Sequence, residues 1–391
     1  MSVGTVFANR YRMALCVSIL VLQAAMPVQT HADATHYALW GAVEAKPAAG
    51  EAVPGNDRTL LGRDGPRICA VRQTEDRIYV YALPADQTSA GEVVAAVDGN
   101  DEPRVVSRTG PLVVGTSRRM LMLSDGALSP LEGVRYLGMT VGDSATGNPE
   151  ERLWDTSETP TFALTVTPGP VVWAAIRAAG MSYGIYALSR QDQPATGEMN
   201  WIGAFLSPRD AALDHLIHMA PTDPAGAWVY SPHKLSARFR LARLSRHGSG
   251  MDAAVEIEPS PFVAEIPSLM NASLCAGNEG ELYIAGEHVS GNLLVIVRPT
   301  GVETVRLPTD ILHGRRPVAL ALDASGDLLV ATDGAGVISY DGEEWQQHPV
   351  TTHLPQYPFG EGLYRVDDIL TAEDGRLYVA SGHWATVWSP E

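Results

Sequence analysis

Residues 328–345 read LLVATDGAGVISYDGEEW, and this stretch decides the fold class. Leu328 to Thr332 is a short apolar run, and a glycine-rich turn separates it from a second run, Val337 to Tyr340. The pair Asp341-Gly342 then predicts a hairpin turn before a third strand that begins at Trp345. Three short strands cannot bury both faces of their own sheet. The pattern therefore predicts a repeat protein whose units pack against one another.

Six further copies of this signal occur along the chain. Each copy is a turn that ends in glycine and leads into an apolar strand, and successive glycines are 45 to 59 residues apart. The glycines of the seven copies are Gly65, Gly110, Gly169, Gly226, Gly280, Gly326 and Gly375. This period is typical of propeller blades, each made of four antiparallel strands. Helical periodicity is nearly absent, so we expect an all-β protein, a seven-bladed β-propeller. Six or eight blades are the alternatives, because the spacing is loose between the second and fourth copies.

The last unit ends at Trp388 and lacks an outer strand. The segment Thr35 to Trp40 (THYALW) precedes the first complete unit and has the alternating character of a strand. Pairing of this N-terminal strand with the last blade would close the ring and remove exposed sheet edges. We therefore expect residues 35–391 to form one propeller domain whose ring is closed in this way.

Residues 1–34 are predicted to be a cleaved secretory signal peptide of the bacterial Sec type. Two arginines precede Met13 to Met26, a run that is apolar apart from one serine and one glutamine. The run is shorter than the roughly twenty residues that a membrane-spanning helix needs. Cleavage fits after Ala32 or after Ala34. We expect a periplasmic or secreted protein with no stable membrane span.

The acidic composition argues against a nucleic-acid partner. The chain has 28 Lys and Arg against 45 Asp and Glu, a net charge of −17. Loss of residues 1–32 would bring the net charge to −19, because that segment holds two arginines and no other charged side chain of these types. Binding to nucleic acid relies on clusters of Lys and Arg that neutralise phosphates.

Cys69 and Cys275 are the cysteines outside the signal segment. They fall in the first and fifth units, which are not neighbours around a ring, whereas a disulfide needs Cα atoms within about 7 Å. The positions predict two separate buried thiols.

The sixth unit carries the pattern DGxGVxxYDGxxW, which begins at Asp333 and ends at Trp345. The segment from Gly362 to Tyr378 is similar to the start of another such repeat. These residues resemble the repeat of the two-component-regulator propellers, which are periplasmic sensor domains of bacteria, and the likeness covers the fifth to seventh units. The resemblance implies an exported recognition module.

One position of the repeat predicts a binding site. Equivalent residues of propeller units form a ring around the axis, and the loop after the first strand of each copy offers one residue to that ring. These residues are Gln73, Arg118, Arg177, His233, His288, Gly334 and His383. The connections between blades add Arg315 and Arg365 on the same face, and Trp384 is a candidate to stack on a sugar or ring. In an acidic chain this local excess of cationic side chains predicts a pocket for a carboxylate, sulfate or acidic sugar, because Arg presents two parallel donors.

A metal centre is not expected at this ring. Zinc needs ligand nitrogens about 2.0 to 2.1 Å from the ion, and His233, His288 and His383 stand on separate blades. The ring also suggests no cofactor.

The predicted function is an exported, non-catalytic module that binds a small anionic ligand or an envelope protein. An alternative is a periplasmic lyase or hydrolase in which His233, His288 or His383 is the general base and Arg118 or Arg177 holds an anion. A further alternative is a scaffold in the assembly of the cell envelope.

Overall fold

The computed structural model describes most of the chain beyond residue 57. The described residues are 34–38, 58–74, 77–84, 91–99, 101–130, 134–139, 152–154, 160–167, 171–177, 183–189, 200–204, 217–222, 225–232, 240–247, 254–262, 265–354, 363–382 and 384–389. The predicted signal peptide lies outside them, apart from its last residue. No helix among the described residues is long and apolar enough to cross a membrane.

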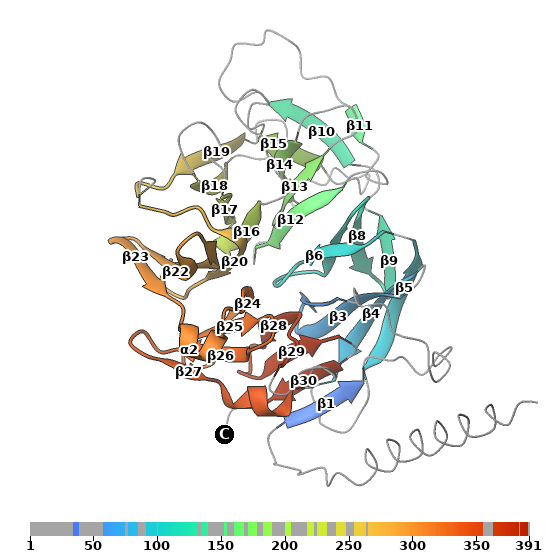
Figure 1. Cartoon of the computed structure of the whole chain (residues 1–391). Coiled ribbons are helices and arrows are strands. Elements are labelled where there is room, and N and C mark those ends of the chain that lie inside the picture. Colours follow the sequence, from blue (N-terminus) through green and yellow to red (C-terminus); the bar gives the residue numbers. More distant parts are fainter. Residues whose placement is uncertain are drawn as a thin grey trace, which may run out of the picture. The chain divides into compact units, whose positions relative to one another are not determined.

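The fold is all-β, as predicted, and its strands form sheets that follow one another in chain order (Figure 1). The first two sheets contain β2 (Thr59–Asp64), β3 (Arg67–Thr74), β4 (Arg77–Leu83) and β5 (Glu92–Asp98), then β6 (Pro103–Val106), β7 (Val113–Thr116), β8 (Met120–Ser124) and β9 (Ala127–Pro130). Two later sheets contain β16 (His218–Thr222), β17 (Gly226–Tyr230), β18 (Leu241–His247) and β19 (Ala254–Pro259), then β20 (Met270–Ala276), β21 (Leu282–His288), β22 (Gly291–Arg298) and β23 (Gly301–Arg306).

The stretch that opened the sequence analysis forms the next sheet, with β24 (Pro317–Leu322), β25 (Leu328–Thr332), β26 (Gly336–Tyr340) and β27 (Trp345–Gln347). The last sheet contains β28 (Asp368–Thr371), β29 (Leu377–Ser381) and β30 (Trp384–Trp388), and β1 (Ala34–Ala38) lies next to β30. A short helix α2 (Thr309–Leu312) precedes β24, and a 3-10 helix η4 (Pro349–His353) follows β27.

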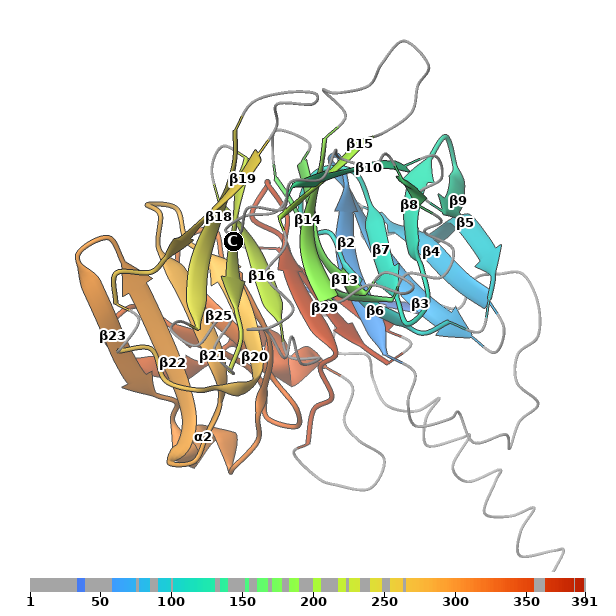
Figure 2. The same cartoon turned by 90° about the horizontal axis from the view of Figure 1, so that it is seen from above.

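One sheet has more strands than the four expected of a blade, and it changes the predicted number of four-stranded blades. It has six strands in the order β11-β10-β15-β14-β13-β12, with β10 (Val134–Met139), β11 (Arg152–Trp154), β12 (Thr161–Val166), β13 (Val171–Arg177), β14 (Tyr183–Ser189) and β15 (Asn200–Ala204). β10 pairs in parallel with β15, beside which it lies in Figure 2, and β11 pairs antiparallel with β10. The prediction of seven four-stranded blades is therefore wrong. Among the described residues six sheets have four strands, which gives six such blades instead of seven, and the loosely spaced part of the sequence supplies two additional strands to the remaining sheet.

The first strands of successive sheets contact one another along the chain, from β2 to β6, β12, β16, β20, β24 and β28, and β28 also contacts β2. Buried apolar side chains fill the spaces between neighbouring sheets. Leu61 of β2 shares one such cluster with Tyr378 of β29. Trp173 of β13 is fully buried in another, and its indole N–H donates to the carbonyl of Ala225 at 3.0 Å. This tryptophan therefore packs in the core between two sheets.

The two cysteines are separate free thiols, as predicted. Cys69 of β3 is fully buried, whereas Cys275 of β20 is only partly buried. Burial raises the pKa of both thiols, to about 12 for Cys69 and to about 11 for Cys275.

Two glycines of the β24–β27 sheet allow a matched test of packing. Gly336 has φ +80°, and an added Cβ would lie 2.8 Å from Oγ1 of the buried Thr351. That hydroxyl bonds to both backbone groups of Val337, at 3.0 and 2.9 Å. Gly342 also has a positive φ, +101°, but an added Cβ would meet nothing within 4 Å.

Gly336→Ala is expected to lower the free energy of unfolding by about 2 to 5 kcal/mol, because backbone strain adds to overpacking. Gly342→Ala is expected to cost only the strain, about 1 to 2 kcal/mol. Denaturant unfolding of both variants measures the difference. Equal losses would contradict the close approach of Gly336 and Thr351.

Candidate functional site

The sheet register places the loops of the predicted ring beside the connections that enter the sheets. Pro103 at the start of β6 pairs with Thr116 at the end of β7, and Pro317 at the start of β24 pairs with Thr332 at the end of β25. The chain therefore leaves each second strand at the end where it enters the first strand. We call this end of the sheets the loop face.

The predicted site residues occupy different kinds of position. Arg118 lies between β7 and β8, whereas Arg177 and His288 are the last residues of β13 and β21 and so belong to strands. Trp384 is the first residue of β30, not a loop residue as expected. Arg315 and Arg365 lie in the connections that enter β24 and β28. His233 and His383 fall outside the described residues, as do the side chains of Arg177 and Trp384.

Arg315 is an exposed cation of the loop face. The residue is exposed, and in the described part of the chain its guanidinium makes no hydrogen bond or ion pair. Its side chain lies over the backbone of Gly334, where an added Cβ would be 3.0 Å from Arg315 Cδ and Nε. The glycine therefore leaves room for the arginine.

Backbone contacts fix the position of Arg315. Its carbonyl accepts a hydrogen bond from Nδ2 of Asn292, at 2.6 Å, which ties it to the β20–β23 sheet. The carbonyl of Gly334 accepts from the backbone N–H of Tyr364 at 2.9 Å, which ties the β25–β26 turn to the segment that enters β28. Beside them, Arg316 lies 3.5 Å from the carboxylate of Asp333. Three sheets thus meet around Arg315.

Arg365 follows Tyr364 in the chain, but unlike Arg315 it forms an ion pair with an acidic side chain. Its Nε donates to Oδ1 of the buried Asp367 at 2.8 Å, and its guanidinium lies near Gly382. The other oxygen of Asp367 accepts from the backbone N–H of Gly382 at 2.7 Å. Arg365 therefore helps to hold the loop that leads to His383, and part of its charge is neutralised.

His288 lies in the hairpin next to Asn292. Its Nδ1 is 2.8 Å from Oγ of Ser290 and accepts from the backbone N–H of the same serine at 3.2 Å. The local hairpin therefore occupies one ring nitrogen. Among the described residues, no group of three or more His, Cys, Asp or Glu side chains is arranged to hold a metal ion. His233 and His383 stay untested in this respect.

Arg118 belongs to a different part of the loop face. It is exposed, and no contact within the described ranges joins it to Arg315 or Arg365. Its neighbour Arg119 is engaged instead: Nε lies 2.9 Å from Oδ2 of Asp101, whose side chain is 4% exposed. Burial alone would raise the pKa of Asp101, but the hydrogen bonds from Arg119 and Thr116 outweigh it and hold this pKa below its ordinary value.

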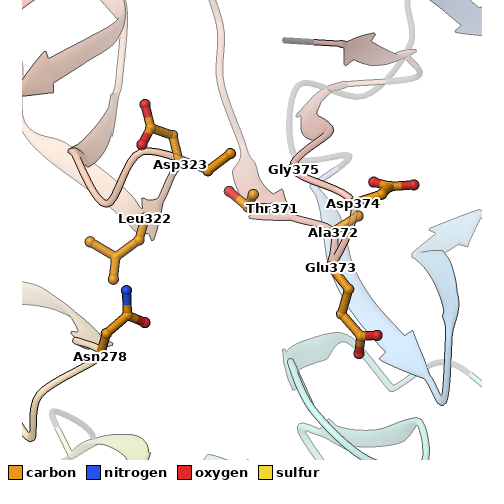
Figure 3. A pocket seen from close by; sticks show the side chains of 9 residues that line it. Asn278, Leu322, Asp323, Thr371, Ala372, Glu373, Asp374 and Gly375 are labelled. Carbon is orange, nitrogen blue, oxygen red and sulfur yellow. The ribbon is translucent and has the colours of Figure 1, made fainter.

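A cavity at the opposite end of the sheets was not expected from the sequence. It has a volume of about 450 Å³ and lies among the turns β20–β21, β24–β25 and β28–β29 (Figure 3). Its lining residues are Asn278, Leu322, Asp323, Ala324, Thr371, Ala372, Glu373, Asp374 and Gly375. The sequence signal at these places is the glycine turn of the repeat, which predicts a turn but not a cavity. We call this end the turn face.

No protein-family model matches the sequence. No curated protein sequence matches it either. The structure is similar to PorZ, a bacterial surface component of the type-IX secretion system of Porphyromonas gingivalis, with a TM-score of 0.53 and 13% identity over 88% of this chain and 48% of PorZ.

It is also similar to the extracellular domain of the hybrid two-component system BT4673 from B. thetaiotaomicron, with a TM-score of 0.51 and 13% identity over 87% of this chain. The chain spans 39% of that structure. Streptogramin B lyase is similar too, with a TM-score of 0.52 and 12% identity over 86% of this chain and 95% of the lyase. At such low identities these likenesses show the β-propeller fold and leave the activity open.

Arg119→Ala is expected to lower the free energy of unfolding at pH 7 by about 3 to 5 kcal/mol, because it leaves the buried Asp101 carboxylate without its cation. The native pKa of Asp101 is depressed, so the stability from this pair is present above the unfolded pKa, about 3.9. It is lost as the pH falls through the native pKa. The difference in the free energy of unfolding between wild type and variant should therefore become smaller below about pH 4. Urea unfolding of both proteins at several pH values measures this difference.

The adjacent Arg118→Ala is the matched control, because Arg118 is exposed and its guanidinium has no partner among the described residues. We expect its effect on stability to stay within about 0.5 kcal/mol. A loss at pH 7 as large as that of Arg119→Ala would contradict the assignment.

Proposed function

We propose that this protein is an exported, non-catalytic β-propeller that binds the anionic group of a small molecule or of a protein partner on its loop face. The observation that carries the proposal is the exposed guanidinium of Arg315, which has no acidic partner in the described part of a chain of net charge −17. In such an acidic chain, an exposed arginine that has no internal acidic partner is free to form an ion pair with an external anion.

The surroundings of Arg315 suit this role. Asn292 and Tyr364 fix its backbone environment, and Gly334 leaves space beside its side chain. A pre-positioned arginine loses less conformational freedom on binding than a mobile one. A carboxylate or sulfate is the matching ligand chemistry, because its oxygens accept two parallel N–H bonds.

The exported location and the closed ring belong to the same proposal. The sequence pattern of residues 1–34 supports export, and one similar structure is an extracellular domain. The position of β1 next to β30, together with the contact between β28 and β2, supports a ring closed by the N-terminal strand. PorZ, as a surface component of a secretion system, supports a protein as an alternative source of the anionic group.

The test is a thermal-shift screen of the protein against carboxylates, sulfated and uronic saccharides and acidic peptides. A ligand at about 100 times its Kd should stabilise the protein by about 2.7 kcal/mol. Arg315→Ala is expected to weaken the binding of any such ligand about tenfold or more, because one hydrogen bond to a charged group contributes about 1.5 to 3 kcal/mol.

Arg67→Ala is the control, because Arg67 is an exposed arginine at the start of β3, on the turn face. It should leave the affinity unchanged. If Arg315→Ala binds the ligand as tightly as the wild type, Arg315 is not the anion site and the proposal is wrong. Arg118→Ala in the same screen shows whether the site extends to the β6–β9 sheet.

A further inference from the structure

The loop between β6 and β7 contacts several sheets at the turn face. It comprises residues 107–112 (SRTGPL), and we call it the crossing loop. Its carbonyl groups bind the neighbouring first sheet: Ser107 O accepts from the N–H of Arg63, and Gly110 O accepts from the N–H of Gly65, both at 3.0 Å. The start of the crossing loop is therefore anchored along β2 and the β2–β3 turn.

The crossing loop also binds the sheet on its other side. The hydroxyl of Thr109 donates to the carbonyl of Val166, the last residue of β12. Gly110 is packed against the same valine, because an added Cβ would lie 2.7 Å from its Cγ1. These contacts hold residues 109–110 between the sheets on both sides of the β6–β9 sheet.

The side chain of Arg108 connects the crossing loop to two further sheets. Its Nη1 donates to the carbonyls of Leu320 in β24, at 2.8 Å, and of Ile369 in β28, at 3.1 Å. Its Nη2 forms an ion pair with Asp368, whose side chain is 4% exposed. β6 contacts β2, β2 contacts β28 and β28 contacts β24. The side chain of Arg108 therefore reaches sheets that are two and three places away, across the space framed by the first strands.

We propose that the crossing loop is a plug that closes this central space at the turn face, and that Arg108 holds the plug in place. The cavity lies farther toward the turn face than the contacts that Arg108 makes with β24 and β28. Its lining residues Leu322 and Thr371 are two positions along the same strands from Leu320 and Ile369. In consequence, within the described part of the chain, the plug separates the cavity from the loop face. This inference does not depend on the identity of any ligand.

Cys275 provides a reporter of the plug. It lies on β20, in the sheet next to that of Leu320. Burial raises the pKa of its thiol, and the positive charge of Arg108 opposes this rise. Removal of Arg108 has two effects of opposite sign on the reaction of Cys275 with a maleimide. Loss of the charge raises the thiol pKa and slows the reaction, whereas loss of a plug uncovers more of the partly buried thiol and speeds it.

The experiment measures the labelling rates of Cys69 and Cys275 in the purified protein by peptide mass spectrometry. In Arg108→Ala we expect labelling of Cys275 to become at least tenfold faster, while the fully buried Cys69 stays unreactive and shows that the variant is folded. Arg118→Ala, on the same sheet but on the loop face, should leave both rates unchanged. A Cys275 rate that falls, or stays as in the wild type, in a folded Arg108→Ala protein overturns the proposal.

Arg108→Lys is the second variant, and it covers the case in which Arg108→Ala does not fold. Lysine keeps the charge opposite Asp368 but lacks the planar group that reaches both carbonyls. We expect an intermediate Cys275 rate, with Cys69 still protected. If Cys69 becomes as reactive as Cys275 in both variants, Arg108 is required for folding as a whole, and the plug as a separate device is refuted.

Discussion

Two adjacent buried carboxylates at the start of β28 join the first and last sheets of the propeller. Asp367 is 8% exposed and Asp368 is 3% exposed. Asp368 accepts from the backbone N–H of Leu61 at 2.9 Å, and Asp367 accepts from that of Thr59 at 3.3 Å. These amides lie on the edge of β2 with which no strand pairs in the described part of the chain. A buried charge is costly unless it is paired, and here the strand edge and the arginines supply the partners.

The same carboxylates organise both ends of the molecule. Asp367 holds Arg365 and the N–H of Gly382, and so positions the part of the loop face next to Tyr364. Asp368 holds Arg108, which crosses from the second sheet. The junction of the first and last sheets is therefore linked to the proposed anion site on one side and to the plug on the other. A rigid junction is what a binding face built from several sheets requires, because its residues must keep their spacing without a common strand.

Five arginines at the two ends of the sheets fall into two groups, which only their contacts separate. Arg119, Arg108 and Arg365 each face a buried aspartate and serve mainly to neutralise it. Arg315 and Arg118 are exposed and have no such partner among the described residues. Composition does not distinguish these five residues, and the position in the repeat selected Arg118 without showing that its neighbour Arg119 is paired with a buried acid. The availability of a guanidinium for a ligand is a property of its surroundings, because an ion pair already formed must be broken before an external anion can bind.

The sequence alone determined the fold class, the turns and the separate thiols. Glycine turns followed by short apolar strands are local signals, and a hairpin such as the one at Asp341-Gly342 forms from residues that are neighbours in the chain. Tertiary structure alone decided the six-stranded sheet, in which Arg135 lies beside Asn200, and the contacts of Arg108 with residues more than 200 positions away. It also decided the cavity at the turn face. Such pairings join segments that are distant in sequence, so no local pattern encodes them, and each depends on where the rest of the chain has placed its partner.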